Sequence, residues 1–385
     1  MLTENQRLIT YFALIPLILL ACVPAQVEPL PASETISPSG DTPIPLVDLS
    51  ANQTYLGYTG GLYPGSSSQM PDQHHRAGLE SAASIQPRDV DGNPHPQGKI
   101  ILLSIGMSNA SQEFCHAGPE PPQGCYPYSF MGKAAQDESV NHANLVLING
   151  AFAGALTHQW TSPDDEYGHY ARIESQLANQ GLSPLQVQAV WVKLANGSPQ
   201  VSLPHPNADA LRFLADLGEV VRTLKTLYPN LQQAYLSSRI YGGYADPDHS
   251  LNPEPYAYEY GYAVKWLLEA QIEQMDSGQV DPQSGSLDYN AGTAPWLSWG
   301  AYLWADGMNP RQLDGLIWEI NDFAGDQTHP SPAGREKVAD LLMQFFKTSA
   351  HTCSWFLADA PCPDPDEGNH LFTRLHLPIL ILRSG

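Results

Sequence analysis

The chain has 385 residues, enough to bury the core of one large domain or two smaller ones. It contains 18 Lys plus Arg against 40 Asp plus Glu, and the resulting formal net charge of −22 argues against binding to the phosphate backbone of nucleic acids. Hydrophobic residues make up 42% of the chain, as in an ordinary globular protein, while 34 prolines and 31 glycines indicate many ordered turns.

The N-terminus has the features of an export signal over residues 1–22. Arg7 precedes an apolar run, residues 8–23, which is short for a membrane span and has the length of a signal-peptide core. The sequence LLAC, which ends at Cys22, is similar to a bacterial lipoprotein box, in which the cysteine is lipidated and becomes the first residue. Cleavage after Ala25 is the alternative. We expect export in both cases, to the outer face of the cell envelope if lipid-anchored and otherwise by secretion.

Three further segments follow the signal. Residues 23–55 are rich in Pro and Ser and have the composition of a flexible tether. Residues 56–350 form the folded domain, and the Gly-, Pro-, Ser- and His-rich stretch 51–98 predicts an irregular ordered beginning to it. Residues 351–385 form a C-terminal extension. Its apolar tail, 371–385, is too short to span a bilayer, and we expect it to pair as an edge strand or to dock on the domain.

Five short apolar runs predict strands that are covered on both faces of a sheet. They occupy residues 99–105, 145–150, 188–194, 233–238 and 315–320. Helical patterns cover residues 170–181, 208–229, 256–275 and 332–347. Ser331 suits the N-cap of the last helix, and Pro332 its first position. The alternation predicts an α/β fold: a three-layer α/β/α sandwich with a mostly parallel, flavodoxin-like sheet of about five strands, whose ligands bind at the carboxyl ends of the strands.

The cysteines other than Cys22 predict disulfides. The two short-range pairs are the economical choice among three pairings, and an exported chain meets oxidising conditions. These pairs are Cys115 with Cys125, and Cys353 with Cys362. We expect no metal site, because no Cys-x-x-Cys spacing occurs and the adjacent His74 and His75 have no further spaced ligands.

Two polar motifs follow the first and the last predicted strand. Gly106-Met107-Ser108-Asn109 places a serine just past the first strand, and Asp326 and His329 follow the last. A nucleophilic serine needs a base within hydrogen-bond reach, and the base needs an orienting group. The simpler alternative is that Asp326 caps a turn and that His329 is an exposed polar residue.

Acyl transfer also needs donors for the developing oxyanion. We expect three candidates at the same edge of the sheet: the N–H of Ser108, the N–H of Gly154 after the second strand, and the side chain of Asn196 after the third. Gly150 competes with Gly154 for this role. An ordinary turn at Asn196 and Gly197 is the alternative to a donor there.

The order of these residues resembles the SGNH, or GDSL-like, hydrolase superfamily over about residues 99–347. Members place a serine after strand one, a glycine after strand two, an asparagine after strand three and an Asp-x-x-His before the last helix. Gly-x-Ser-Asn is similar to the sialate O-acetylesterase-type branch. The resemblance implies an SGNH-like hydrolase domain at 56–350, with Ser108 as nucleophile, His329 as base, Asp326 as its orienting group, and Gly154 and Asn196 in the oxyanion hole.

The chain departs from the family pattern at two places. Met107 stands where the commoner branch has aspartate, and the third block reads Lys193-Leu194-Ala195-Asn196 in place of Gly-x-Asn-Asp. Candidate substrate-binding residues are Asn109, beside the serine, and Arg239, Tyr241 and Trp299, which belong to or adjoin the aromatic-rich stretch 241–304. Flat aromatic faces suit sugar rings, and the alternative is that these rings pack in the core. Arg239 either binds an anionic group or pairs with a nearby carboxylate.

The expected function is that of an exported serine esterase that cleaves an ester through an acyl-enzyme on Ser108, with O-acetyl groups of carbohydrate as candidate substrates. The resemblance implies no metal and no organic cofactor. The expected partner is a small-molecule or carbohydrate ester, and a membrane is contacted only through the N-terminal lipid. One alternative is a catalytically inactive, surface-anchored carbohydrate-binding protein on the same scaffold, favoured by the unusual third block. Another is a structural protein of the envelope.

Overall fold

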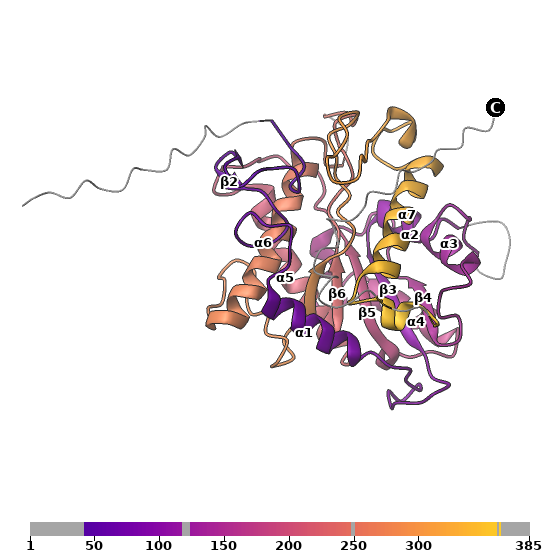
Figure 1. Ribbon diagram of the computed structural model, residues 1–385. Helices are drawn as coiled ribbons and strands as arrows, with labels where there is room; N and C mark the ends of the chain where they lie inside the picture. Colours follow the sequence, from indigo (N-terminus) through magenta and orange to yellow (C-terminus); the bar gives the residue numbers. More distant parts are fainter. Residues whose placement is uncertain (1–41, 118–123, 248–250, 360–361, 363–385) are drawn as a thin grey trace, which may run out of the picture. The chain divides into compact units, whose positions relative to one another are not determined.

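The computed structural model describes residues 42–117, 124–247, 251–359 and 362 (Figure 1). The predicted export signal, the lipidation at Cys22 and the apolar tail 371–385 lie outside the described residues, as does the first part of the tether.

The centre of the described fold is a five-stranded parallel sheet. Its strands are β3 (Ile100–Gly106), β4 (Leu145–Asn149), β5 (Val187–Lys193), β6 (Gln233–Leu236) and β7 (Trp296–Trp299). They pair in the order β4-β3-β5-β6-β7, and every neighbouring pair is parallel. This is the flavodoxin-like order, in which the carboxyl ends of the first and third strands lie beside a switch in connection direction. The predicted α/β class and sheet are confirmed.

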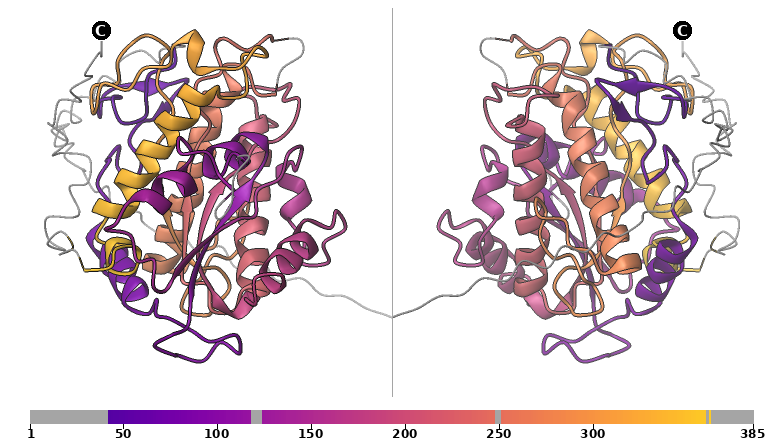
Figure 2. Two further views of the ribbon diagram at one scale, coloured as in Figure 1. Left: turned by 90° about the vertical axis from the view of Figure 1, so that its right-hand side faces the viewer. Right: turned by 90° about the vertical axis from the view of Figure 1, so that its left-hand side faces the viewer.

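Helices flank the sheet on both sides (Figure 2). Their bounds are α1 (Asp72–Ala83), α2 (Ser108–Phe114), α3 (Phe130–Gln136), α4 (His169–Ala178), α5 (Asp209–Leu227), α6 (Tyr256–Ser277), α7 (Pro332–Thr348) and α8 (Cys353–Phe356). The 3-10 turns η1 (Thr157–Trp160), η2 (Pro184–Gln186) and η3 (Ile320–Asp322) and the two-residue strands β1 (Thr54–Tyr55) and β2 (Tyr58–Thr59) complete the described elements. The four helices predicted from periodicity, α4 to α7, occur within three residues of their predicted bounds.

The start of α7 is defined locally, as the sequence predicts. Ser331 is the N-cap and its Oγ accepts from the N–H of Gly334 at 3.4 Å, with Pro332 at the first helical position. A Cβ on Gly334 would lie 2.1 Å from the carbonyl oxygen of Asp322, so glycine lets the helix start against this loop. The loop between Asp322 and Ser331 is therefore held at both of its ends.

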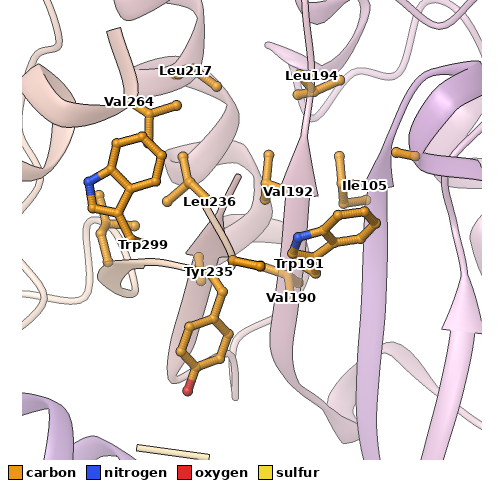
Figure 3. Close-up of a cluster of buried hydrophobic side chains, with 14 of the residues drawn as sticks. Ile105, Val190, Trp191, Val192, Leu194, Leu217, Tyr235, Leu236, Val264 and Trp299 are labelled. Atoms are coloured by element: carbon orange, nitrogen blue, oxygen red, sulfur yellow. The ribbon is translucent and has the colours of Figure 1, made fainter. Parts of the chain in front are cut away.

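Large aromatic side chains fill much of the core around β5, β6 and β7 (Figure 3). Trp191, Tyr235 and Trp299 are each at most 1% exposed. Their polar atoms are satisfied inside the core, since the indole N–H of Trp191 donates to Ser237 Oγ at 3.0 Å. Aromatic residues bury the most area per residue, which makes this cluster a principal source of stability.

Two expectations for secondary structure are wrong. Residues 315–320 are not a strand, because the fifth strand is β7 and the 315–320 run ends at Ile320, which is 45% exposed. The stretch 51–98 is not irregular throughout, because it contains α1. This helix buries a narrow side of small and imidazole side chains, and a Cβ on Gly78 would lie 2.3 Å from the Trp296 ring. Such a side has little hydrophobic periodicity, so the sequence pattern does not predict this helix.

The two predicted disulfides are present. Cys115 is bonded to Cys125 across 5.2 Å between Cα atoms, and Cys353 to Cys362 across 5.6 Å. Disulfides indicate folding in an oxidising compartment. Among the described helices, none has the length and apolar character that a membrane crossing requires.

Candidate active site

Ser108 lies at the corner where β3 ends and α2 begins. Gly106 makes the corner possible, because a Cβ there would lie 2.4 Å from Ala110 Cβ and 2.5 Å from the carbonyl oxygen of Lys193. Ser108 is the first residue of α2 and is 6% exposed. The serine is thus held at the carboxyl edge of the sheet by a backbone contact that only glycine allows.

The structure brings together the three residues that the sequence singles out. Ser108 Oγ lies 2.7 Å from His329 Nε2, and His329 Nδ1 lies 2.5 Å from Asp326 Oδ2. The other oxygen of the carboxylate accepts from the N–H groups of Thr328, at 3.1 Å, and of His329, at 3.0 Å. Asp326 and His329 therefore form a self-contained turn that presents the imidazole to the serine.

The charge on Asp326 is favoured by this turn. Partial burial by itself raises the pKa of the Asp326 carboxyl, but the backbone and side-chain hydrogen bonds from His329 and the N–H of Thr328 outweigh it and lower the pKa below its ordinary value. An ionised carboxylate at Nδ1 keeps the proton on that nitrogen and leaves the lone pair of Nε2 directed at Ser108. This is the arrangement needed to remove a proton from a hydroxyl group.

Asn109 fastens the helix of the serine to the loop of the histidine. Its Nδ2 donates to the carbonyl oxygen of Thr328 at 3.2 Å, and the side chain is buried. The carbonyl of His329 in turn accepts from the N–H of Ala324 at 2.7 Å. Asn109 thereby ties the element of Ser108 to the loop of His329, and its role in substrate binding stays a prediction.

A buried ion pair lies behind the serine helix. Lys193 Nζ, at the end of β5, is 2.6 Å from both carboxylate oxygens of Glu113 in α2, and both side chains are almost fully buried. Burial lowers the pKa of Lys193 to about 8, against the opposing attraction of Glu113. In the sequence, Lys193 stands out only as a departure from the family pattern, because nothing there pairs it with a residue 80 positions away.

Arg239, a predicted anion-binding residue, belongs to the same buried surroundings. It is 3% exposed, and one of its terminal nitrogens donates to the carbonyl oxygen of Leu251 at 3.4 Å. Burial lowers its pKa, and the carboxylates of Glu113 and Glu254 act in the opposite direction. The charge of Arg239 is therefore offset at a distance by neighbouring carboxylates, and its role in binding an anion stays a prediction.

The loop that follows β4 crosses the carboxyl ends of two neighbouring strands. The N–H of Phe152 donates to the carbonyl oxygen of Gly106 at 2.9 Å, and the N–H of Thr157 donates to that of Ala195 at 3.3 Å. Gly154 lies between these two ties at φ +79°, with no atom within 4 Å of the place a Cβ would take. Gly150 is packed instead, because its Cβ would lie 2.5 Å from the Ser104 carbonyl oxygen. Of the two glycines, Gly154 is the one beside open space.

The side chain of Asn196 is engaged by α5. Its Nδ2 donates to Asp216 Oδ2 at 3.2 Å, and the backbone carbonyl oxygen of the same residue accepts from Asn252 Nδ2 at 2.6 Å. Burial raises the pKa of Asp216, and the hydrogen bond from Asn196 counters that rise. The roles of Asn196 and Gly154 as oxyanion donors stay predictions.

The aromatic residues predicted to bind substrate are mostly core residues. Trp299 is 1% exposed, and its indole N–H donates to the carbonyl oxygen of Leu62 at 2.7 Å. It lines a cavity that is not lined by Ser108, Asp326 or His329. Tyr241 is partly buried and packs edge-on against Tyr244, with ring centres 5.1 Å apart. No group of three or more His, Cys, Asp or Glu side chains that could hold a metal occurs among the described residues.

A scan against models of protein families gives no match, and neither does a search of curated proteins. Solved structures similar to this chain include a candidate GDSL-like lipase from Parabacteroides merdae, with 15% identity, 68% of this chain and 97% of that chain covered, and a TM-score of 0.36. A psychrotrophic esterase from Pseudoalteromonas has 12% identity, coverage of 64% and 96%, and a TM-score of 0.32. A variant of an acetyl-xylooligosaccharide esterase from Geobacillus has 16% identity, coverage of 64% and 94%, and a TM-score of 0.32. Identities and TM-scores this low do not establish the activity of the chain, which depends on its own side chains.

Proposed function

We propose that the protein is an exported serine esterase that works through an acyl-enzyme on Ser108. The observation that carries the proposal is the line of contacts from Ser108 Oγ to His329 Nε2, at 2.7 Å, and from His329 Nδ1 to Asp326 Oδ2, at 2.5 Å. Nucleophile, base and orienting group in this order activate a serine for attack on a carbonyl carbon.

The proposed reaction has two halves. His329 Nε2 takes the proton of Ser108 as Oγ bonds to the ester carbonyl carbon, and the resulting imidazolium is stabilised by ionised Asp326. The tetrahedral intermediate collapses when the bond to the alkoxy oxygen breaks, and the leaving alcohol receives the proton from Nε2. A water molecule, deprotonated by the same nitrogen, then attacks the acyl carbon. The bond from that carbon to Ser108 Oγ breaks, Oγ takes the proton back from Nε2, and the carboxylic acid is released.

The proposed donors for the oxyanion are the N–H groups of Ser108 and Gly154. Ser108 begins α2, and the first N–H groups of a helix have no partner within the helix. Gly154 lies in the loop tied to Gly106, on the open side described above. The side chain of Asn196 can donate to the oxyanion only if its Nδ2 breaks the hydrogen bond to Asp216.

Export is the second part of the proposal. The two disulfides suit an oxidising compartment. The lipoprotein-like LLAC sequence supports a lipid anchor on Cys22. Mass spectrometry of the mature N-terminus tests it: a lipidated Cys22 as the first residue is expected, and an unmodified chain that starts at residue 26 would show ordinary cleavage instead.

Replacement of the serine tests the enzyme. Ser108→Ala should lower kcat/KM for a small acetyl ester by at least about a thousandfold while leaving the unfolding midpoint unchanged. A fluorophosphonate probe should label the wild type and not the variant. Equal turnover by both proteins would refute the mechanism. An unlabelled wild type without esterase activity would favour the inactive carbohydrate-binding protein.

A further inference from the structure

The loop beside Ser108 carries the exposed aromatic side chains of the described fold. Six large hydrophobic residues are exposed in the part of the chain that the structure describes, and the aromatic ones among them are Phe152, at 45%, and Tyr167, at 46%. Both belong to the segment between β4 and α4. Trp299 and its aromatic neighbours are accounted for by packing in the core. The exposure of Phe152 and Tyr167 to solvent needs another explanation.

These two rings are part of a continuous row. The ring centre of Phe152 lies 5.7 Å from that of His169, and the Tyr167 ring is nearly parallel to the His169 ring at 6.2 Å. His158 meets Tyr167 edge-on at 5.8 Å. We call Phe152, His158, Tyr167 and His169 the ring shelf. His169 is buried and stacks on Trp160 at 4.8 Å, so the row has a fixed support underneath.

The ring shelf lies at the edge of the sheet where Ser108 lies. The N–H of Phe152 donates to the carbonyl oxygen of Gly106, two residues before the serine. Open space adjoins Gly154, two residues after Phe152. Phe152, the shelf residue nearest in sequence to Gly154, is therefore tied to the strand end that leads into Ser108.

The charges around the shelf disfavour a ligand that carries a carboxylate. Asp164 and Glu166 are exposed and directly precede Tyr167. Of the nearby arginines, Arg172 is partly buried, holds the carbonyl oxygen of Gly150, and lies 5.0 Å from the Phe152 ring centre. Arg239 is buried. A carboxylate on the ligand would meet the negative charges of Asp164 and Glu166 at this shelf.

We propose that the ring shelf binds the pyranose or furanose ring of a neutral sugar whose O-acyl group is then presented to Ser108. This rests on the proposed esterase function and adds its substrate class. Flat apolar ring faces pack on the C–H face of a sugar.

Turnover of two matched esters tests the shelf. With an acetylated methyl glucoside, Phe152→Ala and Tyr167→Ala should each lower kcat/KM about tenfold, and Tyr167→Phe, which keeps the ring, should stay close to the wild type. With ethyl acetate, which has no ring, all three variants should stay within about twofold. Val280→Ala, which shortens an exposed apolar side chain outside the shelf, is the control and should change neither rate.

The outcomes separate the shelf from the esterase. Equal losses on both esters, or no loss on the sugar ester, would overturn the shelf while Ser108-dependent hydrolysis of ethyl acetate upheld the enzyme. A wild type that hydrolyses neither ester would overturn both. Unchanged unfolding midpoints in the variants establish that any loss is local.

The charge of the sugar is tested with an acetylated methyl glucuronide. At low ionic strength its kcat/KM should be at least tenfold below that of the acetylated glucoside. The double variant Asp164→Asn, Glu166→Gln should narrow this gap, as should added salt. A preference for the glucuronide would overturn the neutral class.

Discussion

At the scale of single residues, the candidate site is built around one turn. Asp326 holds the ring of His329 with one oxygen and accepts two backbone N–H groups with the other. The base is therefore oriented before any ligand arrives, and Asn109 sets its distance from the serine through Thr328. Orientation fixed in advance lowers the cost of reaching the transition state.

Asp326→Asn should lower kcat by about 10²- to 10⁴-fold near neutral pH. The amide can donate to Nδ1, which would move the ring proton to Nε2 and remove the acceptor that Ser108 needs. The side chain of Asp326 is 52% exposed, so the unfolding midpoint should hardly change. Steady-state kinetics and thermal unfolding check this, with exposed Asp276→Asn as the control. More than a tenth of wild-type activity would contradict the assigned role.

Lys193→Met should destabilise the fold by about 3–5 kcal/mol, because it leaves the carboxylate of Glu113 buried without its partner. The double variant Lys193→Met, Glu113→Gln removes both charges and should recover part of the loss. Urea unfolding measures both free energies. If the double variant is no more stable than Lys193→Met, the ion pair is not the source of the effect.

At the scale of elements, the edge strand β7 is protected by side chains. Gln271 of α6 accepts from the N–H of Leu297 at 2.8 Å and donates to the carbonyl oxygens of Leu287 and Pro295 at 2.9 Å each. His74 of α1 lies 2.8 Å from the carbonyl oxygen of Leu297. An unpaired strand edge favours pairing with other chains, and these contacts prevent it.

Gln271→Ala should cost about 1–3 kcal/mol of unfolding free energy for each buried backbone group it leaves unpaired. It should also increase aggregation near the unfolding midpoint, because the edge of β7 loses part of its cover. Urea unfolding and light scattering measure the two effects. Glu273→Ala, an exposed change on the same helix, should leave both as in the wild type. An unaltered stability would mean that the Leu297 N–H finds another acceptor.

The sequence predicts the elements whose signals are local. Strands β3 to β6 are apolar runs, α5 and α7 have a regular apolar stripe, and Asp326 precedes His329 by one turn. The features that the sequence does not predict depend on distant partners. Trp299 has the aromatic character of a binding residue, but its strand and its hydrogen bond to Leu62 place it in the core. The pairing of Lys193 with Glu113 and the tie from Asn109 to Thr328 exist only once the sheet edge has formed.

At the scale of the whole molecule, buried imidazoles make stability depend on pH. Burial lowers the pKa of His74 to about 4 and that of His351 to about 3, from an ordinary value of 6.5. His351 packs on Trp296, as does His74, with ring centres 4.8 and 5.1 Å away. Between pH 6.5 and about 4, the unfolded chain binds more protons at these positions than the folded one, so acid favours unfolding.

The contribution of these two histidines to the free energy of unfolding should therefore fall as the pH drops from 6.5 toward 4, by about 1.4 kcal/mol per pH unit for each. Glu259, whose pKa burial raises to about 7, has the opposite effect between pH 7 and 4.5. Urea unfolding at pH 7, 6 and 5 measures the slope. His74→Gln keeps a hydrogen-bond donor for the carbonyl oxygen of Leu297 but does not titrate. It should lower the slope of unfolding free energy against pH by the contribution of one histidine. His205→Gln, an exposed change, should leave the slope as it is. A slope that does not change in His74→Gln would contradict the prediction.

The serine and the histidine are 221 positions apart along the chain, one after the first strand of the sheet and the other after the last. Turnover therefore requires that everything between them be folded at once. Either end of the domain can be unfolded locally by a variant, a denaturant or a protease cut. Activity should then be lost before spectroscopy detects a change in average helix content. Catalytic activity therefore reports whether the whole domain is native. A loss of activity at urea concentrations that leave the spectroscopic signal unchanged would reveal partial unfolding.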